Sequence, residues 1–167
     1  MASSAPVLLV IWHSLTGATE AAVLALANGA ASEPDVAVRC LRAADAAAED
    51  VLGADAVVFA TPETLGSISG GMKDFFDRSY YPLLDQCAGK ACALLVCAGS
   101  DGRPTLAQLQ RIATGLRLRC VAEPLLIHTH AQTPAAIAAH KQLSDAQRQQ
   151  AHDLGAMLAA GLALGLF

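Results

Sequence analysis

The chain has 167 residues, of which 54% are hydrophobic and 16% are charged, and its formal net charge is −4. This length and apolar content predict a single compact domain, residues 1–167, with a sizeable core. Basic and acidic residues are interspersed rather than gathered into a basic stripe, which argues against nucleic acid or an anionic membrane as a partner. The expected partner is a small molecule.

The cysteines and the ends of the chain indicate a cytoplasmic protein. The five cysteines are odd in number, form no C-x-x-C pair and lie mostly in apolar runs, where a reduced thiol behaves as a small hydrophobe. No basic segment precedes the first apolar run, as a secretory signal would require. The uncharged C-terminal stretch 154–167 is shorter than the about 20 residues needed to cross a bilayer.

Apolar strands alternate with helical segments along the chain. Strands are predicted over residues 7–12, 36–41, 56–60, 91–98 and 120–127, the last of them interrupted by Pro124. Helices are predicted over residues 18–32, 45–52, 70–79, 105–116 and 144–162. Five apolar strands in this alternation predict an α/β fold with a parallel sheet covered on both faces. Ligands bind such sheets at the carboxyl ends of the strands, where the loops 14–19, 61–69 and 99–103 are expected to meet.

The first of these loops carries three hydroxyl side chains at the start of a helix. Ser14, Thr16 and Thr19 surround Gly17, and the unpaired amides of a helix N-terminus favour an anion at the same place. No lysine or arginine lies in the loop, whereas a triphosphate-binding P-loop needs one. The loop therefore predicts a site for a phosphate monoester. An ordinary Ser/Thr-capped turn is the alternative reading.

A second motif gives the loop a family context. Within residues 54–78 an Asp-Ala pair and an apolar run lead to Thr61-Pro62, and the pattern G-x-x-S-G-x-M-K-x-F-x-D then runs from Gly66 to Asp77. Together with S-x-T-G-x-T at 14–19, this segment resembles the flavodoxin-like FMN proteins, above all the NAD(P)H-dependent FMN and quinone reductases of the tryptophan-repressor-binding-protein-like family. The resemblance covers roughly residues 7–127 in the correct order.

The resemblance implies a flavodoxin-like three-layer sandwich, with a five-stranded parallel sheet in the order 2-1-3-4-5, and FMN as cofactor. The flavin would carry the redox chemistry, so no catalytic side chain is expected. The residues implied for the phosphate are Ser14, Thr16, Gly17, Ala18 and Thr19. Those implied for the isoalloxazine ring are Pro62, Glu63, Thr64, Leu65, Gly66 and Ser67, with Gly99, Ser100, Asp101 and Gly102 at its pyrimidine end.

The implied function is an oxidoreductase that takes hydride from NAD(P)H and passes it to a small acceptor such as a flavin or quinone. A flavodoxin-type electron carrier is the alternative. Carriers commonly cover the ring with aromatic side chains, but this chain has Leu65 and Ile68 in the second loop and no aromatic in the third. An open ring face suits stacking of a nicotinamide. The long quinone reductases have an arginine and an aromatic where Thr64 and Leu65 stand, which makes quinone a doubtful acceptor.

A rival site overlaps the third loop. Cys97 and Arg103 match C-x₅-R, the phosphate loop of cysteine phosphatases, in which a low-pKa thiolate attacks phosphorus. Asp101 would place a negative charge inside the anion cradle, and Pro104 replaces the usual hydroxyl. The phosphatase is kept as a minor alternative.

The sequence also offers two histidines, two tyrosines and an apolar C-terminal segment whose roles have more than one reading. His128 and His130 point the same way at a strand end, where a solvated loop pair is the favoured reading and a contact with the flavin or a metal is the alternative, although no third ligand is near in sequence. An exposed flavin ring predicts a covering subunit, and hence a homodimer or a dimer of dimers with Tyr80 or Tyr81 reaching a neighbour's flavin. The apolar residues expected to supply the contact are Met157, Leu158, Leu162 and Leu166.

Overall fold

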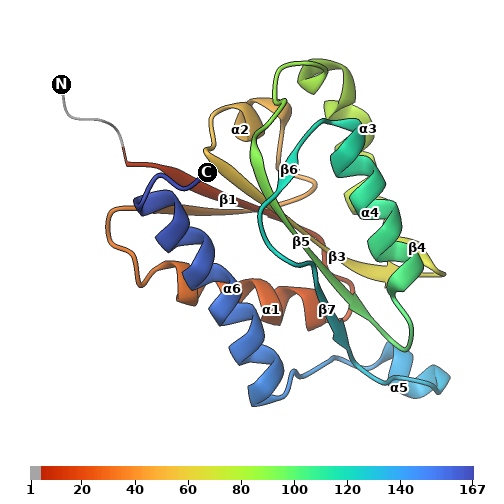
Figure 1. Cartoon of the computed structure of the whole chain (residues 1–167). Coiled ribbons are helices and arrows are strands. Elements are labelled where there is room, and N and C mark those ends of the chain that lie inside the picture. The colour runs from red at the N-terminus through yellow and green to blue at the C-terminus, as the bar shows by residue number, and fades with distance from the viewer. Residues whose placement is uncertain (1–4) are drawn as a thin grey trace.

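A computed structural model describes residues 5–167 as a parallel sheet between two layers of helices (Figure 1). The strands are β1 (Val7–Trp12), β2 (Ala37–Arg42), β3 (Ala56–Thr64), β4 (Ser67–Ile68), β5 (Ala91–Ala98), β6 (Arg119–Cys120) and β7 (Leu125–His128). The helices are α1 (Ala18–Ala30), α2 (Ala48–Leu52), α3 (Gly70–Leu83), α4 (Arg103–Gly115), α5 (Pro134–Ala138) and α6 (Asp145–Ala163).

The strand order confirms the predicted flavodoxin-like fold. The parallel strands lie in the order β2-β1-β3-β5, and β6 and β7 follow as two pieces of one edge strand that both pair with β5. The edge strand is broken at residues 121–124, because Pro124 has no N–H to donate to the ladder. Counted as five strands, this is the order 2-1-3-4-5.

Alternate residues of each central strand are buried on opposite faces of the sheet. On β1, Leu8 and Val10 face the core under α1 and α6, whereas Leu9 and Ile11 face the core under α3. All four side chains are fully buried. β1 therefore reads as a continuous apolar run, as expected for a strand covered on both faces.

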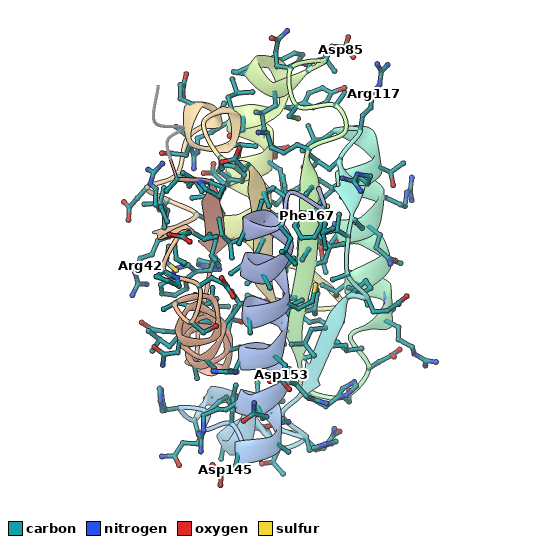
Figure 2. The ribbon with its side chains drawn as sticks, turned by 60° about the vertical axis from the view of Figure 1, so that its left-hand side comes forward. Arg42, Asp85, Arg117, Asp145, Asp153 and Phe167 are labelled. Atoms are coloured by element: carbon teal, nitrogen blue, oxygen red, sulfur yellow. The ribbon has the colours of Figure 1, made fainter. Side chains whose placement is uncertain are left out.

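Helices α1 and α6 approach one another closely at two glycines. Figure 2 shows α6 lying beside α1, with Asp145 near one end of the molecule and Phe167 nearer the other. A Cβ atom at Gly155 would lie 1.9 Å from the carbonyl oxygen of Leu26, and one at Gly29 would lie 1.9 Å from that of His152. Any side chain at these positions would force the helices apart.

Two segments differ from the sequence-based prediction. The third strand does not end at Thr61-Pro62 but continues to Thr64, and it turns back as the short antiparallel strand β4. Pro62 lies beyond Ala60, the last residue of β3 that pairs with β1, so its missing N–H costs no hydrogen bond on that side. Helix α5 was not predicted, because its five residues lack an apolar period.

The surface predicted for a subunit contact is wrong in half of its residues. Leu158 and Leu162 are 0% and 6% exposed because they pack against α1 and the sheet. Only Met157 and Leu166 remain exposed, at 41% and 67%. Over residues 5–167, none of the helices has the length and apolar character needed to cross a membrane.

Candidate functional site

The three predicted loops meet at a cavity beside the carboxyl ends of β1, β3 and β5. Its volume is about 100 Å³, several times what one buried water molecule needs in the same measure. Its lining comprises Ser14, Leu15, Thr16, Ala18, Thr19, Pro62, Glu63, Cys97, Ala98, Gly99, Thr129, Ala131, Ile137 and Lys141.

The first loop places the open end of α1 at this cavity. Gly17 precedes the helix with φ +97°, a left-handed conformation that only glycine adopts readily. Its amide donates to Ser14 Oγ at 3.2 Å, and its carbonyl accepts the first helical bond from Ala21 at 2.9 Å. The amides of Ala18, Thr19 and Glu20 have no partner within the helix, so they are available to an anion.

Thr19 is the most telling side chain of the loop. It is 1% exposed, lines the cavity, and its Oγ1 has no hydrogen-bond partner among the described residues. Leaving a buried hydroxyl unpaired costs about 1–3 kcal/mol. An acceptor bound in the cavity would remove that cost.

A segment from the far end of the chain closes over the loop. The Lys141 amide donates to the Thr16 carbonyl at 2.7 Å, and the His140 ring covers Gly17 so closely that a Cβ there would lie 2.3 Å from His140 Cε1. This segment follows α5, which lies beyond the ends of β5 and β7 (Figure 1). Gly17 is thus required by its neighbour as well as by its φ.

The second loop is a β-hairpin rather than an irregular loop. Leu65 and Gly66 form its tip with φ +51° and +73°, and the Leu65 side chain is fully exposed. Helix α4 fixes the hairpin through Gln108 Oε1, which accepts from Ser67 Oγ and from the Ile68 amide, both at 2.9 Å. The tip therefore projects an apolar side chain from a rigid base.

Several polar side chains at the base of the hairpin are paired, whereas the buried Oγ1 of Thr64, nearer the tip, has no partner among the described residues. Thr105 Oγ1 donates to Glu63 Oε2 at 2.6 Å, and Thr61 Oγ1 lies 3.1 Å from Ser69 Oγ. Ser69 Oγ also lies 2.7 Å from Nδ1 of His13, whose pKa is lowered by burial and then by the charge of Arg42. His13 is therefore neutral at pH 7 and joins the end of β1 to the start of α3.

The third loop carries its charges away from the cavity. Arg103 pairs with Asp101 and lowers the pKa of that carboxyl, and the Arg103 side chain is 82% exposed. The Asp101 carbonyl lies 2.8 Å from His128 Nε2. Of this loop only Gly99 lines the cavity.

The cysteine-phosphatase alternative is wrong. Cys97 is 3% exposed, and burial raises the pKa of its thiol to about 12. The nearby Thr19 hydroxyl lowers this pKa by less than burial raises it, and it makes no hydrogen bond of accepted geometry. A thiol that stays protonated at neutral pH is no nucleophile, and Arg103 points to solvent instead of closing an anion cradle.

The structure gathers about half of the predicted site residues at the cavity. Those lining it are Ser14, Thr16, Ala18, Thr19, Pro62, Glu63 and Gly99. Gly17 lies in the same loop beneath His140, and Thr64, Leu65, Gly66 and Ser67 form the hairpin beside the cavity. Ser100, Asp101 and Gly102 lie in the third loop outside the lining. The prediction of these residues as FMN contacts stays a prediction.

Sequence reasoning missed the fourth wall of the cavity, made by Thr129, Ala131, Ile137 and Lys141. Thr129 continues the edge strand by donating from its amide to the Ala98 carbonyl at 2.8 Å. A hydroxyl two residues after the fifth predicted strand was the available signal for Thr129. No local pattern marks Lys141.

The remaining candidates lie apart from the cavity. The rings of His128 and His130 are 5.9 Å apart, and residues 5–167 hold no group of three or more side chains that could bind a metal ion. Tyr80 and Tyr81 are 44% and 78% exposed in the last part of α3, which begins at the cavity end of the sheet and runs away from it. They cannot cover a ligand bound in their own subunit.

Comparison with known proteins bears on the same residues. A family model described as NADPH-dependent FMN reductase matches residues 17–133. A flavodoxin from Aquifex aeolicus is 37% identical over 95 residues, an alignment that covers 56% of this chain and 51% of that protein. The chain thus spans about half the length of this curated relative.

Solved structures share the fold at lower identity. A flavodoxin from the domain Archaea superposes with a TM-score of 0.77 at 19% identity, covering 94% of this chain and 99% of that one. A flavodoxin, WrbA-like protein from Agrobacterium tumefaciens gives 0.67 at 24% identity, covering 95% and 98%. An oxidoreductase from Corynebacterium diphtheriae gives 0.63 at 18% identity, covering 95% and 98%.

Proposed function

The chain belongs to the NADPH-dependent FMN reductase family of FMN-binding proteins with the flavodoxin-like fold, and we propose that it is an oxidoreductase that takes hydride from NAD(P)H and reduces a small acceptor. The observation that carries the proposal is the orphaned Thr19 hydroxyl at the start of α1. The donors are the free amides of the first turn of α1 and the side-chain hydroxyls of Ser14, Thr16 and Thr19. Together they form a set of neutral donors around one point. That set fits the phosphate of FMN.

The hairpin supports an enzyme over an electron carrier. When bound, FMN supplies a ring that accepts and donates hydride. The chain contributes the rigid base of the hairpin, held by Thr105 and Gln108, and an aliphatic tip at Leu65. The nearest exposed aromatics, Tyr80 and Tyr81, belong to the other end of α3. A ring beside this hairpin keeps a face open for a nicotinamide to stack.

Reduction by nicotinamide tests the proposal directly. We expect the purified protein reconstituted with FMN to show the absorption bands of bound flavin. NADH or NADPH, added under anaerobic conditions and without an acceptor, should then bleach these bands directly. The family description favours NADPH as the better donor. Bound flavin that only dithionite reduces would establish the alternative, a flavodoxin-type electron carrier, for which the 37% identical flavodoxin speaks.

We also propose that the enzyme is a homodimer or a dimer of dimers with the flavin site near the interface, where Tyr80 or Tyr81 of a neighbour reaches toward the flavin. Leu65 at the hairpin tip and the two tyrosines toward the far end of α3 are exposed, so each is free to meet a second copy. Sedimentation of the FMN-loaded protein at micromolar concentration is expected to give a dimer or tetramer. A monomer with full NAD(P)H oxidation would contradict this.

A further inference from the structure

The phosphate-binding loop itself holds no positive charge, but the folded chain brings one to it. Among the described residues that line the cavity, Lys141 is the only cation, and it shares the cavity with Ser14, Thr16 and Thr19. Glu63 is the only carboxylate in the lining, and its Oε2 accepts from Thr105. A phosphate monoester carries about −1.5 to −2 charges at pH 7. The neutral donors alone leave that charge uncompensated.

The backbone of Lys141 is attached to the loop, whereas its ammonium group is held only by neutral acceptors. The amide bonds the Thr16 carbonyl at 2.7 Å, which attaches the residue to the loop. The ammonium group donates to the carbonyls of Ile137 and Ala139 at 2.8 and 2.5 Å, at the end of the short helix α5. These acceptors are neutral, and the side chain is only half-buried. A bound phosphate dianion is a much stronger acceptor for an ammonium donor.

Residues 137–141, which we call the strap, strengthen the attraction between Lys141 and a bound phosphate. They pass over the start of α1, and the His140 ring covers Gly17. Covering the loop removes water from one side of the anion site, and electrostatic attraction grows as water is excluded. The cation and the helix N-terminus then attract the same anion.

We propose that Lys141 is the residue that recognises the terminal phosphate and makes the site selective for phosphorylated over unphosphorylated flavin. On binding, its ammonium group exchanges the Ile137 and Ala139 carbonyls for phosphate oxygens. The inference rests on the proposed function, because it takes FMN as the ligand. It adds a specificity residue that lies outside the loop and outside residues 17–133, the part of the chain that the family model matches.

The test compares FMN with riboflavin, which has the same ring and no phosphate. Binding is measured by quenching of flavin fluorescence for the wild type, Lys141→Met and Lys141→Arg, without any turnover. We expect Lys141→Met to raise the Kd for FMN about 10- to 100-fold, the range for a hydrogen bond to a charged group, and to leave that for riboflavin within about twofold. Lys141→Arg should restore most of the affinity, and added salt should weaken FMN binding less in Lys141→Met than in the wild type.

Lys90→Met is the matched control. Lys90 also donates from its ammonium group to two backbone carbonyls, those of Leu52 and Ala54. It lies just before β5, at the amino ends of the strands and so at the end of the sheet opposite the cavity. The Lys90→Met substitution removes the same charge and the same kind of contact. Its affinity for FMN should equal that of the wild type.

Each outcome has one meaning. Equal loss of FMN and riboflavin affinity in Lys141→Met would show that the lysine only holds the strap in place and would overturn the inference. Unchanged FMN affinity would overturn it as well. A wild type that binds neither flavin would instead overturn the proposed function, whereas flavin binding without reduction by NAD(P)H would leave the role of Lys141 standing.

Discussion

Thr19→Val is expected to weaken FMN binding about 10- to 100-fold, equivalent to ~1.5–3 kcal/mol, while making the ligand-free protein more stable. The hydroxyl is buried, faces the cavity and has no partner among the described residues. Valine keeps the shape of the side chain and removes the unpaired group. The same substitution therefore removes a phosphate donor from the complex and a desolvation cost from the free protein.

Two measurements check these two opposite effects, the weaker FMN binding and the more stable ligand-free protein. Flavin titration gives the change in FMN affinity, and urea unfolding of the ligand-free protein gives the change in its free energy of unfolding, expected to rise by ~1 kcal/mol. Ser79→Ala is the control, because Ser79 is also 1% exposed with an unpartnered Oγ, but it lies on α3 away from the cavity. It should leave FMN affinity unchanged. A Thr19→Val protein that binds FMN like the wild type would mean that the phosphate lies elsewhere.

Gly155→Ala is expected to lower the free energy of unfolding by ~3 kcal/mol, the upper end of the usual cost of overpacking. The added methyl group would lie 1.9 Å from the Leu26 carbonyl oxygen and 3.1 Å from the Ala30 amide nitrogen, and neither backbone atom can rotate away as a side chain would. Relief requires α6 to move off α1. Urea unfolding followed by far-UV circular dichroism measures the change.

Gly115→Ala provides the matched control for the helix-pair prediction. Gly115 ends α4, and a Cβ there would meet no atom within 4 Å. Alanine is the better helix former, so this variant should be as stable as the wild type or more stable by up to ~1 kcal/mol. If both substitutions cost the same, the close approach of α1 and α6 is not what requires glycine at position 155.

The fold was predictable because its signals are local. The apolar runs of β1 and β5 and their alternation with helices identify a buried parallel sheet without any knowledge of contacts, and β5 was predicted with the correct bounds. The element that local pattern placed wrongly is the end of β3. Pro62 is typical of a strand end, because proline has no N–H to donate to a neighbouring strand. The pairing with β1 has already ended at Ala60, however, so no hydrogen bond to β1 is lost and β3 continues.

The chemistry of the first loop was likewise readable from adjacent residues. Ser14, Thr16, Gly17 and Thr19 lie within seven residues of the end of β1, so their convergence follows from chain connectivity alone. The burial of Cys97 was also indicated by its place in the predicted strand 91–98, but the pKa of its thiol was not. Its pKa depends on how completely the sheet and α1 exclude water from it, and that burial is a property of the packed molecule.

The sequence by itself determined the order of elements, the place of the site at the carboxyl ends of the strands, and the neutral donors of the first loop. Each of these depends on residues close together in the chain. Only the tertiary structure decided that Thr19 is unpaired, that His140 covers Gly17, and that Lys141 joins the cavity. These are contacts between segments more than 100 residues apart or outcomes of complete burial. Their energies depend on distance and on the exclusion of water, and neither quantity is written in a local pattern.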